Sequence, residues 1–145
     1  ISLHAARAQR RLPLMPIEKK YDLAQVLAAA KAFSKRITFE YVLIAGANDT
    51  DADADALATL ARRQGAMVNL LPLHPGGAPG LTPTAPSRMR AFADRLRSRG
   101  VEAVVRRSRG LDIDAACGQL FVEMEKMRPR SARTEAPEGL PSRDA

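Results

Sequence analysis

Residues 36–73, "RITFEYVLIAGANDTDADADALATLARRQGAMVNLLPL", decide the fold because they follow the pattern of one strand, one helix and a second strand. The β-rich runs begin at Arg36 and at Ala66. Between them, acidic residues crowd the first turn of a periodic segment, and Gly65 stands where a left-handed helix cap belongs. This unit predicts parallel strands with a helix packed on them.

The same alternation continues on both sides of this unit. The run "ISLHA" at the start of the chain and the run "VEAVVR" from Val101 predict two further strands. The predicted order is β-α-β-α-β-α-β, an α/β fold that is either an open doubly wound sheet or part of a (β/α) barrel. In both folds ligands bind at the carboxyl ends of the parallel strands.

Two more helices are predicted on either side of residues 36–73. The first covers residues 22–33 behind an N-cap at Asp22. The second covers residues 87–99, with Ser87 as its cap and Gly100 as its stop. Each helix has one apolar face, formed in the first by Leu23, Val26, Leu27, Ala30 and Phe33 and in the second by Met89, Phe92, Ala93 and Leu96.

The size of the chain bounds its domain organisation. A chain of 145 residues, 46% of them hydrophobic, is large enough for one core and too small for two. We assign residues 1–126 to one domain and expect residues 127–145 to form a flexible, disordered tail, because they have three prolines and no apolar periodicity. The chain starts at Ile1 in what reads as the middle of a strand, so we expect it to be a C-terminal piece of a longer protein.

Charge and cysteine content narrow the partners and the compartment. The 23 Lys and Arg residues against 16 Asp and Glu residues give a net charge of +7, which favours a polyanion such as nucleic acid or reflects an arginine-rich surface. A single cysteine excludes an internal disulfide framework and a site of several thiolates within this chain. It fits a cytoplasmic protein. No apolar run approaches the roughly 20 residues that cross a bilayer, so no membrane partner is expected.

Two motifs resemble ligand sites only in part. The acids of residues 51–55 alternate as in a calcium loop, but Ala56 replaces the turn glycine and Arg62 replaces the bidentate glutamate, so helix capping is predicted instead. The segment "GGAPG" at residues 76–80 has no following Lys-Ser or Lys-Thr and is not a P-loop.

The two histidines each end a predicted strand. His4 and His74 therefore lie at the rim where ligands bind, although a lone histidine is more often an ordinary hydrogen-bonded residue. Two histidines without a neighbouring carboxylate or thiol make no convincing metal site.

The single thiol lies in a basic stretch. Cys117 follows Arg106, Arg107 and Arg109, and Asp114 stands as a helix cap before it. A free cysteine is commonly a small buried hydrophobe, but the positive surroundings and a helix start favour a reactive thiolate. The three arginines suit phosphate contacts, and an aromatic content of 4% argues against a base-stacking platform.

Five stretches resemble, in order and spacing, one known family. "ISLHA", "LMPIEKKYDLAQVL", "RITFEYVLIAGAND", "VNLLPLHP" and "VRRSRGLDIDAACGQL" are similar to the C-terminal half of the radical S-adenosylmethionine (SAM) enzymes that methylate C2 of an adenine in 23S rRNA. Members of that family also modify an adenine in some tRNAs. The resemblance covers residues 1–124 and implies a partial (β/α) radical-SAM barrel with a 4Fe-4S cluster and SAM at the C-terminal rim.

The resemblance also implies residue roles. By this resemblance Ser2, Leu3 and His4 are expected to contact SAM, and His74 stands where the family has an asparagine that does the same. Cys117 matches the cysteine that carries the methyl group as S-methylcysteine in the family, where one SAM methylates the thiolate and a radical from a second SAM activates that methyl group for addition to the base. A second cysteine then releases the methylated base by forming a disulfide with Cys117.

Other parts of the machinery are implied outside this chain. The cluster-binding CxxxCxxC motif, the second cysteine and the general base belong upstream, so this chain holds no metal ligand and is expected to be inactive alone. Arg106, Arg107 and Arg109 are the expected RNA contacts. The expected partners are 23S rRNA, tRNA and an electron donor for the cluster, with a monomeric protein.

Three alternatives stay open at this point. The first is the paralogous resistance branch that methylates C8 of the same base. The second is a basic RNA-binding α/β module without catalysis. The third is a redox-sensing thiol protein that uses Cys117.

Overall fold

A parallel three-stranded sheet forms the centre of the molecule. The computed structural model describes residues 1–74 and 78–106. Strands β1 (Thr38–Leu43), β2 (Met67–Pro72) and β3 (Ala103–Val105) lie in the order β1-β2-β3, and both neighbouring pairs are parallel. The predicted α/β fold with parallel strands is confirmed. The predicted tail, residues 127–145, lies outside the described residues.

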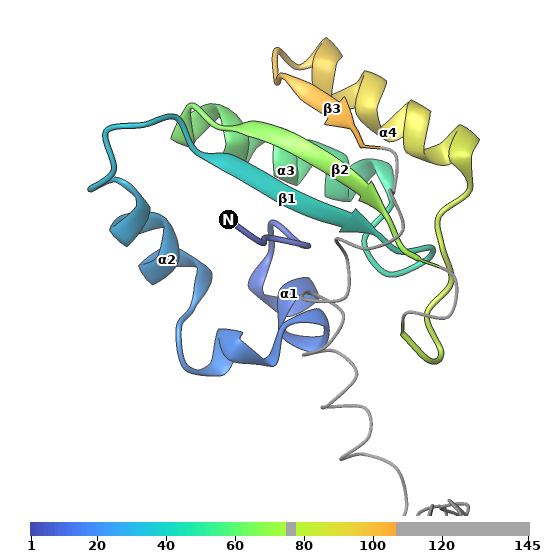
Figure 1. Cartoon of the computed structure of the whole chain (residues 1–145), viewed down its shortest axis with the longest axis horizontal. Coiled ribbons are helices and arrows are strands. Elements are labelled where there is room, and N and C mark those ends of the chain that lie inside the picture. Colours follow the sequence, from blue (N-terminus) through green and yellow to red (C-terminus); the bar gives the residue numbers. More distant parts are fainter. Residues whose placement is uncertain (75–77, 107–145) are drawn as a thin grey trace, which may run out of the picture.

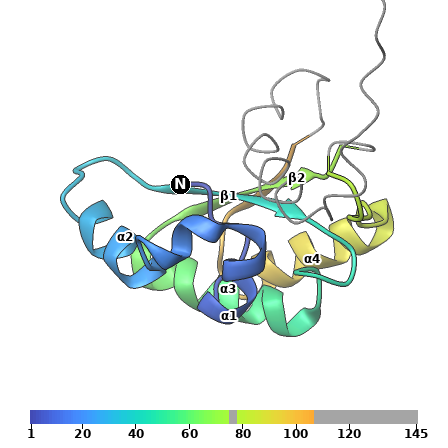
Figure 2. The ribbon, with the colours of Figure 1, turned by 90° about the horizontal axis from the view of Figure 1, so that it is seen from below.

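Helices α3 (Asp51–Gln64) and α4 (Pro86–Ser98) connect these strands and pack on one face of the sheet, behind it in Figure 1. The segment before β1 holds α1 (Ala8–Leu14), a 3-10 helix η1 (Pro16–Lys19) and α2 (Leu23–Ala30). In Figure 2 the helices lie below the strands. The described part of the sheet thus has one face covered by α3 and α4 and one face free of them.

The start of the chain adds a short fourth row to the sheet. Ser2 pairs with Glu40 in a parallel bridge, because the Leu3 N–H donates to the Glu40 carbonyl at 2.9 Å and the Glu40 N–H donates to the Ile1 carbonyl at 2.8 Å. The predicted strand "ISLHA" is therefore much shorter than expected. It ends at His4, whose φ of 55° turns the backbone out of the extended conformation.

Local chemistry explains where the helices begin and end. Asp22 is the N-cap of α2, as predicted, and forms a capping box with Gln25; Thr50 caps α3 in the same way with Asp53. Gly65 ends α3 at a φ of 60°, and Gly100 follows α4 at a φ of 76°. Gly65 occupies the left-handed conformation that the sequence predicts, and Gly100, predicted only as a helix stop, also adopts it; side chains with a Cβ adopt this conformation at a cost.

Two helix predictions are wrong. Ser87 does not cap α4, because the helix starts one residue earlier with Pro86 at its first position and Ala85 as the N-cap. Phe33 does not belong to the buried face of α2, because the helix stops at Ala30 and leaves the Phe33 side chain 74% exposed.

The core lies between the sheet and its two covering helices. Alternate residues of β1 and β2 point into it, and the Tyr41 ring packs against Phe92 of α4 with centroids 5.6 Å apart. A smaller apolar cluster on the opposite side joins Val42 and Ile44 to Leu14 and Leu73. Glu40 and Asn69 lie outside both clusters, so one stretch of the free face is polar.

Candidate functional site

His4 closes the short N-terminal row at the carboxyl edge of the sheet. Its side chain is buried, and its Nδ1 accepts a hydrogen bond from the Val42 N–H at 3.1 Å. Burial, with the positive charge of Arg11, lowers the pKa of His4 to about 4. The ring is therefore neutral at pH 7 and carries its proton on Nε2, which makes that atom a hydrogen-bond donor.

Asn48 ties the His4 turn to the end of β1. It is fully buried, and its Nδ2 donates to the His4 carbonyl at 2.8 Å and to the Val42 carbonyl at 2.7 Å. Its Oδ1 accepts from the Ile44 N–H at 2.7 Å. Each polar atom of this side chain thus has a partner, and two segments of the rim are held in one position.

The Tyr41 hydroxyl holds Asn48 from the core side. It donates to the Asn48 carbonyl at 2.8 Å, and burial raises the pKa of Tyr41 above its ordinary value. The phenol stays protonated at every physiological pH, so this hydrogen bond does not titrate.

A buried ion pair holds the backbone just before the His4 turn in place. Arg11 of α1 pairs with Glu18 of η1, and its Nε donates to the Leu3 carbonyl at 3.2 Å. The other oxygen of Glu18 accepts from the Leu23 N–H at 3.0 Å, at the start of α2. This pair therefore fixes the row that contains Ser2 and Leu3 to the helices that follow it.

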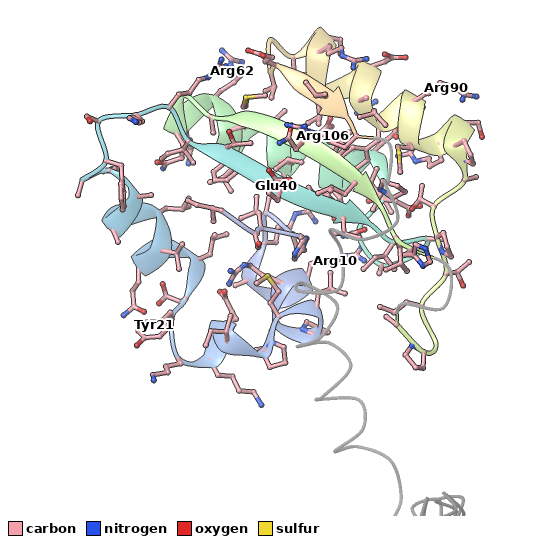
Figure 3. All side chains as sticks on the ribbon, viewed as in Figure 1. Arg10, Tyr21, Glu40, Arg62, Arg90 and Arg106 are labelled. Carbon is pink, nitrogen blue, oxygen red and sulfur yellow. The ribbon has the colours of Figure 1, made fainter. Side chains whose placement is uncertain are left out.

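Three polar residues form a row across the free face of the sheet. Ser2 pairs with Glu40, and Glu40 pairs with Asn69 in the β1–β2 register. Because Leu3, Phe39 and Val68 point into the core, these alternating neighbours point to the other face. The Asn69 Nδ2 donates to Glu40 Oε1 at 2.8 Å. Figure 3 shows Glu40 in front of the sheet.

Asn69 differs from the other buried polar residues in one atom. The side chain is only 4% exposed, and its Oδ1 has no hydrogen-bond partner. Among the buried side-chain oxygens and nitrogens of residues 1–74 and 78–106, no other lacks one. A buried acceptor without a partner is costly, so this atom points to a group that the described residues do not supply.

His74 lies at the same edge of the sheet as His4. It follows the end of β2 by two residues and is exposed, whereas the preceding Leu73 is buried. Since the strands are parallel, their carboxyl ends meet at one edge, and β1 lies between the two histidines in the strand order. The predicted placement of both histidines on this rim is confirmed.

Only one of the three predicted RNA-contacting arginines lies among the described residues. Arg106 directly follows β3, its N–H donates to the Leu70 carbonyl at 2.8 Å, and its side chain is exposed (Figure 3). Arg107 and Arg109 lie outside the described residues, and so does Cys117. The Arg10 guanidinium donates to the Ala47 carbonyl, next to Asn48 in the sequence, at 2.9 Å.

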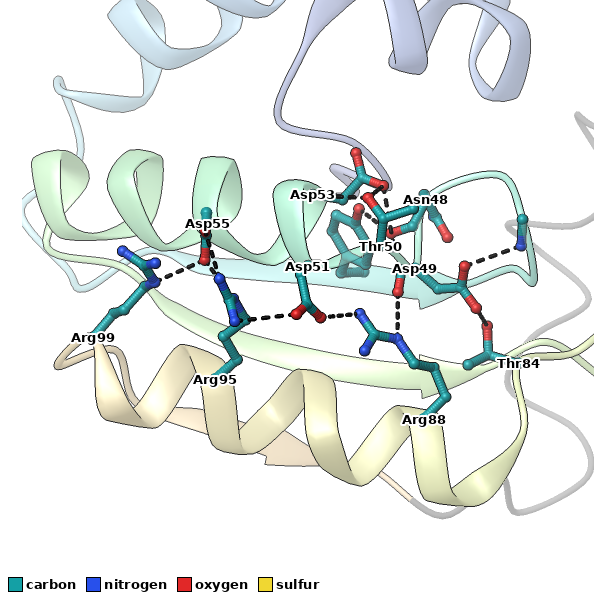
Figure 4. Close-up of polar contacts among 12 residues, drawn as sticks. Asn48, Asp49, Thr50, Asp51, Asp53, Asp55, Thr84, Arg88, Arg95 and Arg99 are labelled. Carbon is teal, nitrogen blue, oxygen red and sulfur yellow. Dashed lines mark hydrogen bonds and ion pairs between the residues drawn. The ribbon is translucent and has the colours of Figure 1, made fainter.

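The acids of α3 bind arginines rather than a metal ion. Asp51 pairs with Arg88 and Arg95 of α4, and Asp55 pairs with Arg95 and Arg99 (Figure 4). Hydrogen bonds from these guanidinium groups lower the pKa of both carboxyls. The described residues contain no group of three or more potential metal ligands.

An apolar hollow elsewhere on the molecule does not coincide with these polar groups. It has a volume of about 560 Å³ and lies against α2, with Ile1, Tyr21 and Phe33 on its walls. Its lining offers few hydrogen-bonding groups, so it does not provide the site's chemistry. None of the helices in residues 1–74 and 78–106 is long and apolar enough to cross a bilayer.

Comparison with known proteins identifies the family of this chain. No family model matches it. A probable dual-specificity RNA methyltransferase RlmN of Gemmatimonas aurantiaca is 55% identical over 123 residues, which are 85% of this chain and 34% of that protein. The dual-specificity RNA methyltransferase RlmN of Anaeromyxobacter dehalogenans is 42% identical over 98% of this chain and 39% of its own length.

A solved structure agrees with the sequence matches. The crystal structure of a radical SAM methyltransferase from Sphaerobacter thermophilus superimposes with a TM-score of 0.72 at 44% identity, over 81% of this chain and 36% of that one. The chain belongs to the RlmN family of radical SAM methyltransferases. It spans about a third of the length of the curated relatives that it matches, at their C-terminal part.

The described residues fit SAM, which the RlmN family implies. A small polar ligand needs both hydrogen-bond donors and acceptors. The rim offers a buried acceptor at Asn69 that has no partner among the described residues, a neutral donor at His4, and the polar row of Ser2, Glu40 and Asn69. The 4Fe-4S cluster does not fit them. It is held by several cysteine thiolates, whereas the whole chain has one cysteine, which lies outside the described residues.

Sequence reasoning missed the residues that support this rim. Asn48, Arg11 and Glu18 position the predicted SAM-contacting segment, and Glu40 and Asn69 extend its polar row. A glutamate and an asparagine inside otherwise apolar strands were the available signal, because such residues are rarely buried without a partner.

Proposed function

We propose that this chain is the C-terminal part of a longer radical SAM enzyme that methylates C2 of an adenine in 23S rRNA and in tRNA. The observation that carries the proposal is the 55% identity to a probable dual-specificity RNA methyltransferase over 85% of the chain. The enzyme acts in the cytoplasm as a monomer, with an electron donor for a cluster whose ligands lie in the part that precedes this chain.

In this proposal SAM lies at the rim described above and supplies the methyl group and the radical that activates it. Ser2, Leu3 and His4 contact it on one side and His74 on the other, where the imidazole replaces the family's asparagine. The hydrogen bonds of Asn48 and Arg11 support these roles, because they hold the Leu3 and His4 carbonyls in place before the ligand arrives. The low pKa of His4 keeps its ring a neutral donor.

Cys117 is the proposed nucleophile. Its thiolate attacks the methyl carbon of one SAM molecule, S-adenosylhomocysteine leaves, and S-methylcysteine forms as the carrier of the methyl group. A cysteine thiolate suits the first step because it is strongly nucleophilic near neutral pH when positive charge lowers its pKa. The arginines that precede it in the sequence supply that charge.

Arg106, Arg107 and Arg109 are the proposed phosphate contacts. Guanidinium groups bind phosphate oxygens without reading the base, so they position the RNA while the adenine enters the site. The exposure of Arg106 at the end of β3 supports this role.

A mass spectrum of the Cys117 peptide tests the chemistry. In a full-length protein that carries this chain, purified after expression with SAM available, we expect one extra methyl group on Cys117. Digested RNA should then contain 2-methyladenosine, and this product should disappear with Cys117→Ser. An unmethylated Cys117 together with undiminished product from the Cys117→Ser variant would contradict the proposal.

The same experiment separates the alternatives. Product carrying 8-methyladenosine would place the chain in the resistance branch. RNA binding that is unaffected by Cys117→Ala, with neither methylated product nor S-methylcysteine, would indicate a binding module without catalysis. Cysteine sulfenic acid under mild oxidant, without RNA affinity, would indicate a redox sensor.

A further inference from the structure

The Glu40–Asn69 pair is not used by the roles proposed so far. It lies on the free face of the sheet, in the same row as Ser2, and is held together by the hydrogen bond from Asn69 Nδ2 to Glu40 Oε1 at 2.8 Å. The bond fixes the amide, so its Oδ1 has one direction in which to accept.

That oxygen is buried and has no hydrogen-bond partner within residues 1–74 and 78–106. Asn69 is 4% exposed, so bulk water does not replace the missing bond. The comparison within the molecule is informative, because buried Asn48 satisfies all of its polar atoms with nearby backbone groups. An acceptor that stays unpaired while its neighbours are paired is arranged for a donor that arrives later.

The position of the Glu40–Asn69 pair indicates which kind of group donates to Asn69 Oδ1. Asn69 lies two strand spacings from Ser2, about 10 Å across the sheet, on the same face. Ser2 is a proposed SAM contact. SAM has N–H donors on its ammonium group and adenine and O–H donors on its ribose, and it is cationic at sulfur. The carboxylate of Glu40 makes this stretch of the face favourable for such a ligand.

We propose that Asn69, oriented by Glu40, accepts a hydrogen bond from an N–H or O–H group of bound SAM. This inference rests on the proposed function, since it requires that the site bind SAM. Asn69 contacts the ligand directly, and Glu40 is a positioning residue that fixes the amide and contributes negative charge.

The test is SAM affinity in a full-length protein that carries this chain. Asn69→Leu removes the acceptor while keeping nearly the same shape. We expect its dissociation constant for SAM, measured by calorimetry, to rise at least tenfold. The melting temperature without SAM should change little, because the variant also removes a buried unpaired oxygen. Thr38→Val, a half-buried position two residues before Glu40 on the same strand face, is the matched control and should leave SAM affinity unchanged.

A second variant separates orientation from charge. Glu40→Gln keeps an oxygen that can accept from Asn69 but removes the charge, so we expect a smaller loss of SAM affinity than with Asn69→Leu. If Asn69→Leu fails to fold, a loss of SAM affinity in Glu40→Gln at unchanged melting temperature supports the proposal, and unchanged affinity overturns it.

Two ligand fragments identify the donor. If the donor is on the nucleoside, Asn69→Leu weakens binding of 5'-deoxyadenosine and leaves that of methionine unchanged. If it is the ammonium group, the pattern is reversed. Either pattern supports the proposal.

The remaining outcomes overturn it, and they distinguish it from the proposed function. Suppose that the wild-type protein binds SAM and yields methylated RNA, and that the Asn69→Leu variant binds SAM with equal affinity. This result would overturn the inference about Asn69 and leave the proposed function standing. A fall in melting temperature or in RNA affinity with unchanged SAM affinity would assign the missing donor to another part of the protein or to RNA. Wild-type protein that does not bind SAM would overturn both.

Discussion

Asn48 and Asn69 are two buried asparagines with opposite hydrogen-bonding states. Asn48 is 0% exposed and makes three hydrogen bonds to backbone groups of the rim. Asn69 is 4% exposed, and among the described residues its side chain makes one hydrogen bond, to Glu40, and its oxygen has no partner. Side chains of the same chemistry therefore serve different purposes. The satisfied one stabilises the fold around the site, and the unsatisfied one gives up stability for a ligand contact.

Removing a partner from the satisfied polar network should have the largest effect. Arg11→Met leaves the buried Glu18 carboxylate without its cation, and we expect a loss of about 4 kcal/mol in the free energy of unfolding, measured with urea. The double variant Arg11→Met/Glu18→Gln should recover part of this loss because no buried charge is left unpaired. A single variant that loses less than about 1 kcal/mol would mean that the pair is not buried in solution.

Asn48→Leu should come second. It removes three hydrogen bonds and leaves two buried carbonyls and one buried N–H without partners, so we expect a loss of about 3 kcal/mol in urea unfolding. Thr59→Val, at an exposed position of α3, is a suitable control and should stay within about 0.5 kcal/mol. Equal stability of the two variants would contradict the structural role assigned to Asn48.

The pH dependence of the free energy of unfolding should show that His4 is buried and neutral in the folded protein. The pKa of His4 is about 4 in the folded protein and about 6.5 in the unfolded chain, so the unfolded state binds the proton first as pH falls. We expect the His4 contribution to fall by about 2 kcal/mol between pH 7 and pH 5. His4→Asn keeps a residue tolerant of positive φ but does not titrate. A wild-type curve parallel to that of His4→Asn over this range would refute the buried neutral histidine.

Asn69→Leu should change stability least among the buried variants. The loss of its bond to Glu40 is offset by removal of the unpaired oxygen, so we expect a change of no more than about 1 kcal/mol without ligand. Measuring the stability losses of Asn69→Leu and Asn48→Leu under the same conditions compares the two asparagines most directly. A loss as large as that of Asn48→Leu would show that Asn69 is structural.

The exposed ion pairs between α3 and α4 should contribute least. Arg95→Gln removes pairs with Asp51 and Asp55, which are solvent-screened. We expect a small destabilisation in low salt that disappears in 1 M sodium chloride. A salt-independent loss would mean that Arg95 contributes through packing of its side-chain stem rather than through charge.

RNA affinity should separate the rim from the rest of the basic surface. If Arg106 contacts phosphate, Arg106→Gln should weaken RNA binding and lower the slope of log affinity against log salt by about 1. Arg62→Gln, an exposed arginine in the last turn of α3, is the matched control. Equal slopes for the two variants would argue against the proposed RNA contact.

The sequence predicted those parts of the fold that depend on local pattern. Asp22 and Gly65 mark helix ends because a cap needs only neighbours along the chain. Helix α1 was missed because it is only seven residues long and because it contains Pro13, a residue that usually ends or kinks a helix. Phe33 was misplaced because periodicity continued beyond the point where the helix ends.

The site was predictable only in outline. The rim positions of His4 and His74 follow from where strands end, which a pattern of alternating strands and helices indicates. The partners of His4 could not be found in this way, because Val42 is 38 residues away and Asn48 is 44 residues away in the sequence. Only the folded chain brings them together, and its described part also shows that the Asn69 oxygen has no partner there.

A crystal structure of the full-length protein with bound SAM tests the central claim most directly. We predict a nitrogen or oxygen of SAM at about 3 Å from Asn69 Oδ1, with the Glu40 bond retained. The claim would be contradicted if that oxygen were paired with another protein group, or if SAM bound without approaching it.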